Sequence, residues 1–283
     1  MTTFFEILKA LLFGIVEGIT EWLPVSSTGH LILLHEFVNL KSSEAFNEMF
    51  DVVIQLGAIL AVIILYFKKL NPFALSKSVE EKKGTWSLWF KVCVAVVPSA
   101  VIGLLFDDIL DAYLYNAYVV SAMLILYGIF FILIERKRSA DSPNAIETTS
   151  AITYKAAFLV GMFQMLALIP GTSRSGATIL GALLLGFSRG AAAEFSFFMA
   201  IPTMAGASLL KAVKFVLDGN SMSSTELIVL VTAFLSAFAV SLVAIKYLTD
   251  YVKKHTFSAF GIYRIVLGAL VLIFFLGKLI VKA

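Results

Sequence analysis

The sequence predicts an all-α polytopic membrane protein with six transmembrane helices plus two re-entrant helical hairpins, arranged as an inverted-topology repeat. Three observations support this fold: the composition, the recurrence of long apolar runs, and two apolar regions that are interrupted in the same way. Of the 283 residues, 60% are hydrophobic and 14% are charged, whereas a soluble domain carries about 25% charged residues. The mean hydropathy is +0.94. Lipid must therefore cover most of this surface, and we expect a single membrane domain over 1–283.

Six apolar runs are close to the ~20 residues that a helix needs to cross the hydrocarbon core of a bilayer. They cover 50–67, 88–106, 116–135, 192–216, 226–248 and 260–281. Since lipid offers no hydrogen bonds to an exposed backbone, runs of this length are expected to be helical.

Two further apolar regions, 4–37 and 154–187, are each broken near the middle by proline, glycine and serine, at 23–30 and at 169–176. Proline and glycine there end one helix and allow another to begin. Each piece is too short to span comfortably. We therefore expect two hairpins of half-helices, each entering and leaving the membrane by the same face.

The charge distribution predicts the topology. Lysine and arginine gather in three linkers, and two other linkers have none, so the first group is assigned to the cytoplasm and the second to the outside. The basic linkers are 68–91, 136–155 and 249–264, and the others are 107–115 and 217–226. The spans alternate correctly only if the second hairpin starts and ends inside and the first enters from outside. The net charge of +3 is thus explained by topology, and we expect no nucleic-acid partner.

Each half of the chain has the same order of elements: a hairpin followed by three spans. The first repeat is assigned to 1–135 and the second to 150–283. An odd number of spans inverts the second half relative to the first, as in transporters with discontinuous helices. Backbone left unpaired at a break is tolerated only where it is buried or lines a wet cavity. The two breaks should therefore face each other around one site.

Two carboxylates, Glu17 and Glu21, precede the first break and lie four residues apart, on one helical face. Acidic residues inside membrane segments are usually functional. The alternative is a pair of surface carboxylates on a helix that lies in the interface. If the two carboxylates are close, they either hold a proton between them or share a divalent cation. Both arrangements suit acid–base chemistry on a phosphate.

Hydroxyl side chains follow at the start of the second half-helix, where Ser26, Ser27 and Thr28 precede Gly29 and His30. Hydroxyls and free amides at a helix N-terminus form a cradle for an anion. An ordinary helix cap is the simpler interpretation of the hydroxyls alone. His30 is a candidate general acid or base, with capping of a neighbouring carbonyl as the alternative.

The second break repeats this pattern with a cation, since Ser173, Arg174 and Ser175 are followed by Thr178 and preceded by Gln164. A bare guanidinium deep in a membrane is costly, and its planar fork fits a phosphate. The alternative partner is one of the two carboxylates before the first break. Thr178 and Gln164 flank this site and are weaker candidates.

The segments 17–30 and 170–178 together resemble the undecaprenyl-diphosphate phosphatase family, also called the bacitracin-resistance family, and the likeness extends over nearly the whole chain. The resemblance implies hydrolysis of undecaprenyl diphosphate to undecaprenyl phosphate and inorganic phosphate. This reaction recycles the lipid carrier for cell-wall synthesis and confers resistance to bacitracin. The resemblance also implies a multi-pass protein of the bacterial inner membrane that requires Mg²⁺ or Ca²⁺.

By this resemblance, five residues match the family's functional positions, five more are expected to bind the substrate phosphates, and two hold the metal. The first five are Glu17, Glu21, Ser27, His30 and Arg174; the phosphate ligands are Ser26, Thr28, Ser173, Ser175 and Thr178; the metal ligands are Glu17 and Glu21. Ser27 is the first choice for the nucleophile, with His30 or Glu21 as its base. Direct attack by water, with Ser27 only binding phosphate, stays open.

A different class of function is also consistent with these residues. Inverted repeats with paired broken helices favour alternating access, so a transporter or flippase of the polyprenyl phosphate carrier is the alternative. A transporter would not need a nucleophile beside a base. The sequence leaves the oligomeric state open and allows a homodimer.

Overall fold

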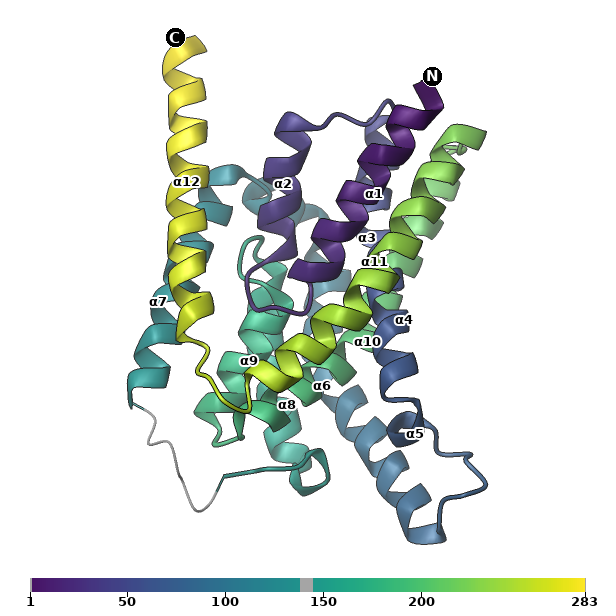
Figure 1. Ribbon diagram of the computed structural model, residues 1–283, viewed down its shortest axis with the longest axis vertical. Coiled ribbons are helices and arrows are strands. Elements are labelled where there is room, and N and C mark those ends of the chain that lie inside the picture. Colours follow the sequence, from purple (N-terminus) through teal and green to yellow (C-terminus); the bar gives the residue numbers. More distant parts are fainter. Residues whose placement is uncertain (1, 138–144, 283) are drawn as a thin grey trace.

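The computed structural model describes residues 2–137 and 145–282, and these form a bundle of helices (Figure 1). In that part of the chain, six helical segments are long and apolar enough to cross a membrane. They are Glu44–Leu65, Val79–Phe106, Ala117–Lys137, Arg189–Leu217, Ser224–Tyr251 and Ser258–Ile280. Each overlaps one of the six predicted runs. The predicted fold class, an all-α polytopic membrane protein, is therefore confirmed.

Each half has a pair of helices followed by three of the spanning segments, and in the first half the first of these segments is divided into α3 and α4. The first half has α1 (Thr2–Thr20), α2 (Ser27–Phe37), α3 (Glu44–Val53), α4 (Gln55–Leu65), α5 (Phe67–Leu70), α6 (Val79–Leu114) and α7 (Ala117–Lys137). The second has α8 (Tyr154–Met165), α9 (Arg174–Leu184), α10 (Arg189–Leu217), α11 (Ser224–Tyr251) and α12 (Ser258–Lys282), with short 3₁₀ turns at Thr149–Ala151 and Leu166–Leu168. One predicted linker, 107–115, is mostly helical, because α6 continues to Leu114. The division into inverted repeats stays a prediction.

The two broken regions are both helical hairpins, α1–α2 and α8–α9, and they approach the middle of the molecule from opposite ends (Figure 1). Their turns touch, since the Ser175 hydroxyl donates to the backbone carbonyl of Glu21 over 3.1 Å. The prediction that the breaks face each other is therefore correct. The re-entrant path of each hairpin through a membrane stays a prediction.

A serine with left-handed backbone geometry begins the second helix of each hairpin. Ser26 has φ 71° and Ser173 has φ 72°, and no other non-glycine residue of the described chain has a positive φ. Each hydroxyl accepts a hydrogen bond from the backbone N–H three residues on, at Gly29 and Gly176. This conformation costs about 1–3 kcal/mol outside glycine, so the surrounding structure must hold it. The two turns share this strained geometry, which fits a repeated unit.

Glycines bring helix backbones into direct contact beside the second hairpin. A Cβ added to Gly161 on α8 would lie 2.1 Å from the carbonyl oxygen of Ala95 on α6. Small residues let membrane helices approach this closely. The α6–α8 contact thus fixes the position of the helix that carries Gln164.

Replacing Gly161 with alanine should therefore destabilise the protein by about 1–3 kcal/mol, because the new methyl group must push backbone apart. Thermal unfolding in detergent measures the loss as a lower Tm. Gly277→Ala on α12 is the matched control, since a Cβ there meets nothing within 4 Å. Equal Tm values for the two variants would contradict the close α6–α8 contact.

Candidate active site

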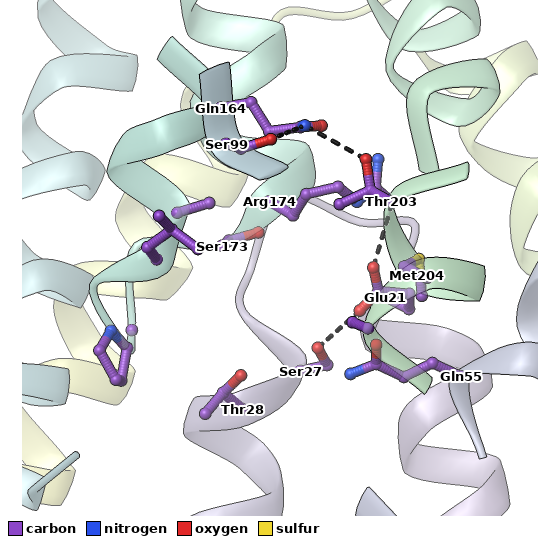
Figure 2. A pocket seen from close by; sticks show the side chains of 15 residues that line it. Glu21, Ser27, Thr28, Gln55, Ser99, Gln164, Ser173, Arg174, Thr203 and Met204 are labelled. Carbon is purple, nitrogen blue, oxygen red and sulfur yellow. Dashed lines mark hydrogen bonds and ion pairs between the residues drawn. The ribbon is translucent and has the colours of Figure 1, made fainter. Parts of the chain in front are cut away.

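A cavity of about 190 Å³ lies between the two breaks (Figure 2). Its walls come from both hairpins and from the long helices α4, α6 and α10. The polar residues that line it are Glu21, Ser27, Thr28, Gln55, Ser99, Gln164, Ser173, Arg174 and Thr203. The cavity therefore brings together five of the predicted site residues, Glu21, Ser27, Thr28, Ser173 and Arg174, from the two hairpins.

Arg174 and Glu21 form the ion pair at the centre of this site (Figure 2), with Nη2 of Arg174 donating to Oε1 of Glu21 over 3.1 Å. The other arm of the guanidinium donates to the carbonyl of Ser196 over 2.6 Å. The Trp22 ring lies 5.7 Å from the guanidinium carbon, a cation–π distance. The Nε of Arg174 is buried and has no partner. The guanidinium is thus held in place through both of its terminal nitrogens, while Nε is left unpaired.

Ser27 is hydrogen-bonded to the Glu21 carboxylate. Its hydroxyl donates to Oε2 of Glu21 over 2.7 Å (Figure 2). A hydroxyl that donates a hydrogen bond to a carboxylate has the geometry of a nucleophile with its base. Because Ser27 is the first residue of α2, its oxygen also lies at a helix N-terminus, where negative charge is stabilised. Glu21 rather than His30 is the base that this geometry favours.

Among the predicted phosphate ligands, Thr28 and Ser173 line the cavity, whereas Ser26, Ser175 and Thr178 do not. The hydroxyl of Ser26 caps α2, and that of Ser175 donates to carbonyls of the first break. Thr178 donates to backbone carbonyls within α9 and is bonded to the Ser196 hydroxyl. The contacts of these three side chains support the turns that shape the site, and their role as phosphate ligands stays a prediction.

His30 is not among the residues that line the cavity. Its Nδ1 lies 2.7 Å from the carbonyl oxygen of Ser26, so Nδ1 carries the proton of this hydrogen bond. Its Nε2 is hydrogen-bonded to the Tyr263 hydroxyl, also at 2.7 Å. These contacts hold the carbonyl of the strained Ser26. A catalytic role for His30 stays a prediction.

Glu17 is fully buried, and neither of its carboxylate oxygens has a hydrogen-bond partner. Its charged neighbours are Glu21, Asp51 and Arg174. A buried carboxylate without a partner is expensive, and a cation would satisfy it. Among the described residues, no group of three or more His, Cys, Asp and Glu side chains could hold a metal. The unpartnered carboxylate oxygens of Glu17 are the kind of ligand that a hard cation takes, and Mg²⁺ commonly binds one or two carboxylates and completes its shell with phosphate oxygens and water.

The charge count assigned Arg264 to a cytoplasmic linker, 249–264, and this assignment is wrong. The residue lies within α12 and is fully buried. Its guanidinium donates to the carbonyls of Pro24, Gly171 and Thr172 at 3.2, 2.8 and 2.9 Å. It therefore joins the two breaks through their free carbonyl groups. An arginine inside the apolar run 260–281 is the signal in the sequence that should have identified it.

Three cavity residues had no signal in the sequence: Gln55, Ser99 and Thr203. Gln55 begins α4 directly after the irregular residue between α3 and α4. Ser99 and Thr203 each follow a proline inside a long helix. Uncharged polar side chains within apolar runs are common, so nothing in their spacing marked them. Gln164, predicted to flank the site, does line the cavity.

Comparison with known proteins identifies the family. A family model described as bacitracin resistance protein BacA matches residues 10–270. The chain belongs to the BacA family. A family member from Enterococcus faecalis is 60% identical over 269 residues, which are 95% of this chain and 97% of that protein. Another, from Streptococcus mutans, is 56% identical over 278 residues, covering 98% of this chain and 99% of the relative. Both relatives are named undecaprenyl-diphosphatase.

Proposed function

We propose that this BacA-family protein hydrolyses undecaprenyl diphosphate to undecaprenyl phosphate and inorganic phosphate. The observation that carries the proposal is the continuous chain of contacts from the Ser27 hydroxyl through Glu21 to Arg174 inside one cavity. Two relatives at 60% and 56% identity are named undecaprenyl-diphosphatase. The reaction would recycle the lipid carrier for cell-wall synthesis and confer bacitracin resistance.

In this mechanism the Arg174 guanidinium binds the diphosphate and neutralises charge as the phosphoryl group transfers. Glu21 removes the proton from Ser27, and the serine oxygen bonds to the terminal phosphorus. The bridging P–O bond breaks, and the lipid monophosphate leaves with the electron pair. Water then releases inorganic phosphate from Ser27. Direct attack by water, with Ser27 only binding phosphate, is the second route.

A divalent cation, Mg²⁺ or Ca²⁺, is part of the proposal. Glu17 and Glu21 would hold it, and it would supply positive charge to the phosphate oxygens. The partnerless, fully buried carboxylate of Glu17 supports this assignment. Glu17 itself does not line the cavity, so its part in the reaction would be exerted through the cation.

The protein is a multi-pass membrane protein, and we place it in the bacterial inner membrane, where the prenyl tail of the substrate can stay in lipid. A homodimer stays a prediction. The transporter alternative is not favoured, because relatives are named for hydrolysis. A transporter of a lipid phosphate would also not need a serine hydroxyl that donates a hydrogen bond to a carboxylate.

The test is phosphate release from a C55 or C15 prenyl diphosphate by the detergent-purified protein, with and without EDTA. We expect release that EDTA abolishes. Replacing Ser27 with alanine should lower the rate by about a thousandfold or more, as loss of a nucleophile does. Acid quenching with substrate labelled at the terminal phosphate should trap phosphoserine on the wild-type protein.

The matched control is Ser241→Ala, which removes a buried serine hydroxyl bonded to the carbonyl of Gly18 and should leave the rate unchanged. No phosphate release with any divalent cation would overturn the proposed function. Release without trapped phosphoserine, together with a modest loss in Ser27→Ala, would establish the direct attack by water. Release that EDTA does not affect would remove the cation from the mechanism.

A further inference from the structure

One group of cavity residues has no part in the mechanism so far. Gln164 on α8, Ser99 on α6 and Thr203 on α10 form a hydrogen-bonded cluster, which we call the amide cluster (Figure 2). All three residues line the same cavity as Arg174 and Ser27. Gln164 is 1% exposed. The amide cluster is thus a buried polar group in the wall of the cavity that holds the reacting groups.

The hydrogen-bond directions in the amide cluster are determined by its two hydroxyls. The Ser99 hydroxyl donates to the carbonyl of Val96 over 3.0 Å, and that of Thr203 donates to the carbonyl of Met199 over 2.8 Å. A hydroxyl has one hydrogen, so towards Gln164 both oxygens can only accept. The Gln164 side-chain nitrogen supplies both bonds, at 2.7 and 3.2 Å. The orientation of the amide is therefore fixed.

This arrangement leaves the Gln164 side-chain oxygen without a partner, although it is buried. An acceptor left buried and unpaired costs about 1–3 kcal/mol. A ligand that satisfies it must bring a hydrogen. An ionised phosphate offers only acceptors, whereas water offers two donors. A cavity of about 190 Å³ has room for a water, which occupies about 30 Å³, beside phosphate groups.

The position of Gln164 in the sequence gives a second observation. Gln164 precedes the strained cap Ser173 by the same number of residues as Glu17 precedes Ser26. Each hairpin therefore presents a buried oxygen acceptor without a partner at the equivalent place. The Gln164 amide forms hydrogen bonds through its nitrogen, and its oxygen has no partner.

We propose that Gln164 is a positioning residue for the water that the hydrolysis consumes, and this inference rests on the proposed function. Its side-chain oxygen accepts one O–H of the water and takes no proton. The water oxygen bonds to the phosphorus carried by Ser27, and the bond between phosphorus and the serine oxygen breaks. Glu21 has by then released to solvent the proton that it took from Ser27, and the proton that the water loses passes through Glu21 to the serine oxygen. Inorganic phosphate then leaves.

The test compares wild type with Gln164→Leu, which keeps the size of the side chain and removes the acceptor. Both hydroxyls of the amide cluster retain their backbone carbonyl partners, so the variant leaves no buried donor unpaired and should fold. With a C15 prenyl diphosphate we expect kcat to fall by about a hundredfold, the cost of a misplaced reacting group, and KM to stay within about twofold. Because only the water step slows, the fraction of protein trapped as phosphoserine should rise.

Two further variants make the result specific. Gln164→Glu restores an oxygen acceptor at the same place and should keep kcat above that of the leucine variant. Ser208→Ala on α10 removes a buried hydroxyl that is hydrogen-bonded to the carbonyl of Val52 and does not line the cavity, and it should change neither kcat nor the trapped fraction. A raised KM with unchanged kcat, or a slower reaction without more phosphoserine, would overturn the role of Gln164 alone. Absence of phosphate release by the wild type would overturn the proposed function as well.

Discussion

Replacing Arg174 with alanine should lower phosphate release by about three orders of magnitude, the scale on which an arginine stabilises a transferring phosphoryl group. The guanidinium is the one cation that lines the cavity in the part of the chain that the structure describes. It is already oriented by Glu21 and the Ser196 carbonyl, and its buried Nε has no other use. Without the Arg174 guanidinium, the negatively charged diphosphate would bind beside the Glu21 carboxylate with no positive charge to balance the two.

The lysine variant of Arg174 separates charge from shape. Lysine keeps the positive charge but cannot offer two parallel donors to a phosphate, so we expect most of the activity to be lost in Arg174→Lys as well. Because alanine leaves the Glu21 carboxylate buried without its partner, Tm must be measured beside turnover. A lysine variant with normal turnover would show that the fork is unnecessary, and an alanine variant with normal turnover would remove Arg174 from the site.

The second large effect is expected at Arg264, where Arg264→Met should destabilise the whole protein. The methionine fills much of the space but leaves the carbonyls of Pro24, Gly171 and Thr172 without donors. Each such group costs about 1–3 kcal/mol. At about 2–4 °C for each kcal/mol in a chain of this size, Tm should fall by about 10 °C, and turnover should fall with it because both breaks shift.

The matched control is Lys278→Met on the same helix, which removes an exposed pair with Glu36 and should change Tm little, since such pairs contribute at most about 1 kcal/mol. Arg264→Lys should be nearly as damaging as the methionine variant, because one ammonium group does not reach three separated carbonyls. If both Arg264 variants keep the wild-type Tm and turnover, the contacts of Arg264 with the carbonyls do not hold the breaks together.

The hairpins and the main reacting groups could be predicted because they depend on local chemistry. Proline, glycine and serine grouped within a few residues favour the end of one helix and the start of another, and the breaks at 23–30 and 169–176 contain the starts of α2 and α9. A charge inside an apolar segment is costly enough to be conspicuous, which identified Glu21 and Arg174. That the two form a pair was one of the alternatives left open.

The rest of the site depends on how distant helices pack, which no short motif encodes. Arg264 was counted with two neighbouring lysines as a loop charge, and only the packing of α12 against both breaks shows its contacts. Ser99 and Thr203 are recognised as part of the site only because both accept hydrogen bonds from Gln164 on a third helix. Each would be an unremarkable polar residue if its helix were rotated by one position.

The burial of Arg264 in α12 has a consequence for biogenesis. Because α12 is the last helix in the sequence, a ribosome delivers it to the membrane after all the helices that line the cavity. Until then the carbonyls of the two breaks lack the donor that joins them. The two breaks are therefore joined through Arg264 only once α12 has packed against them. A nascent chain stalled before residue 264 should therefore be membrane-embedded and inactive.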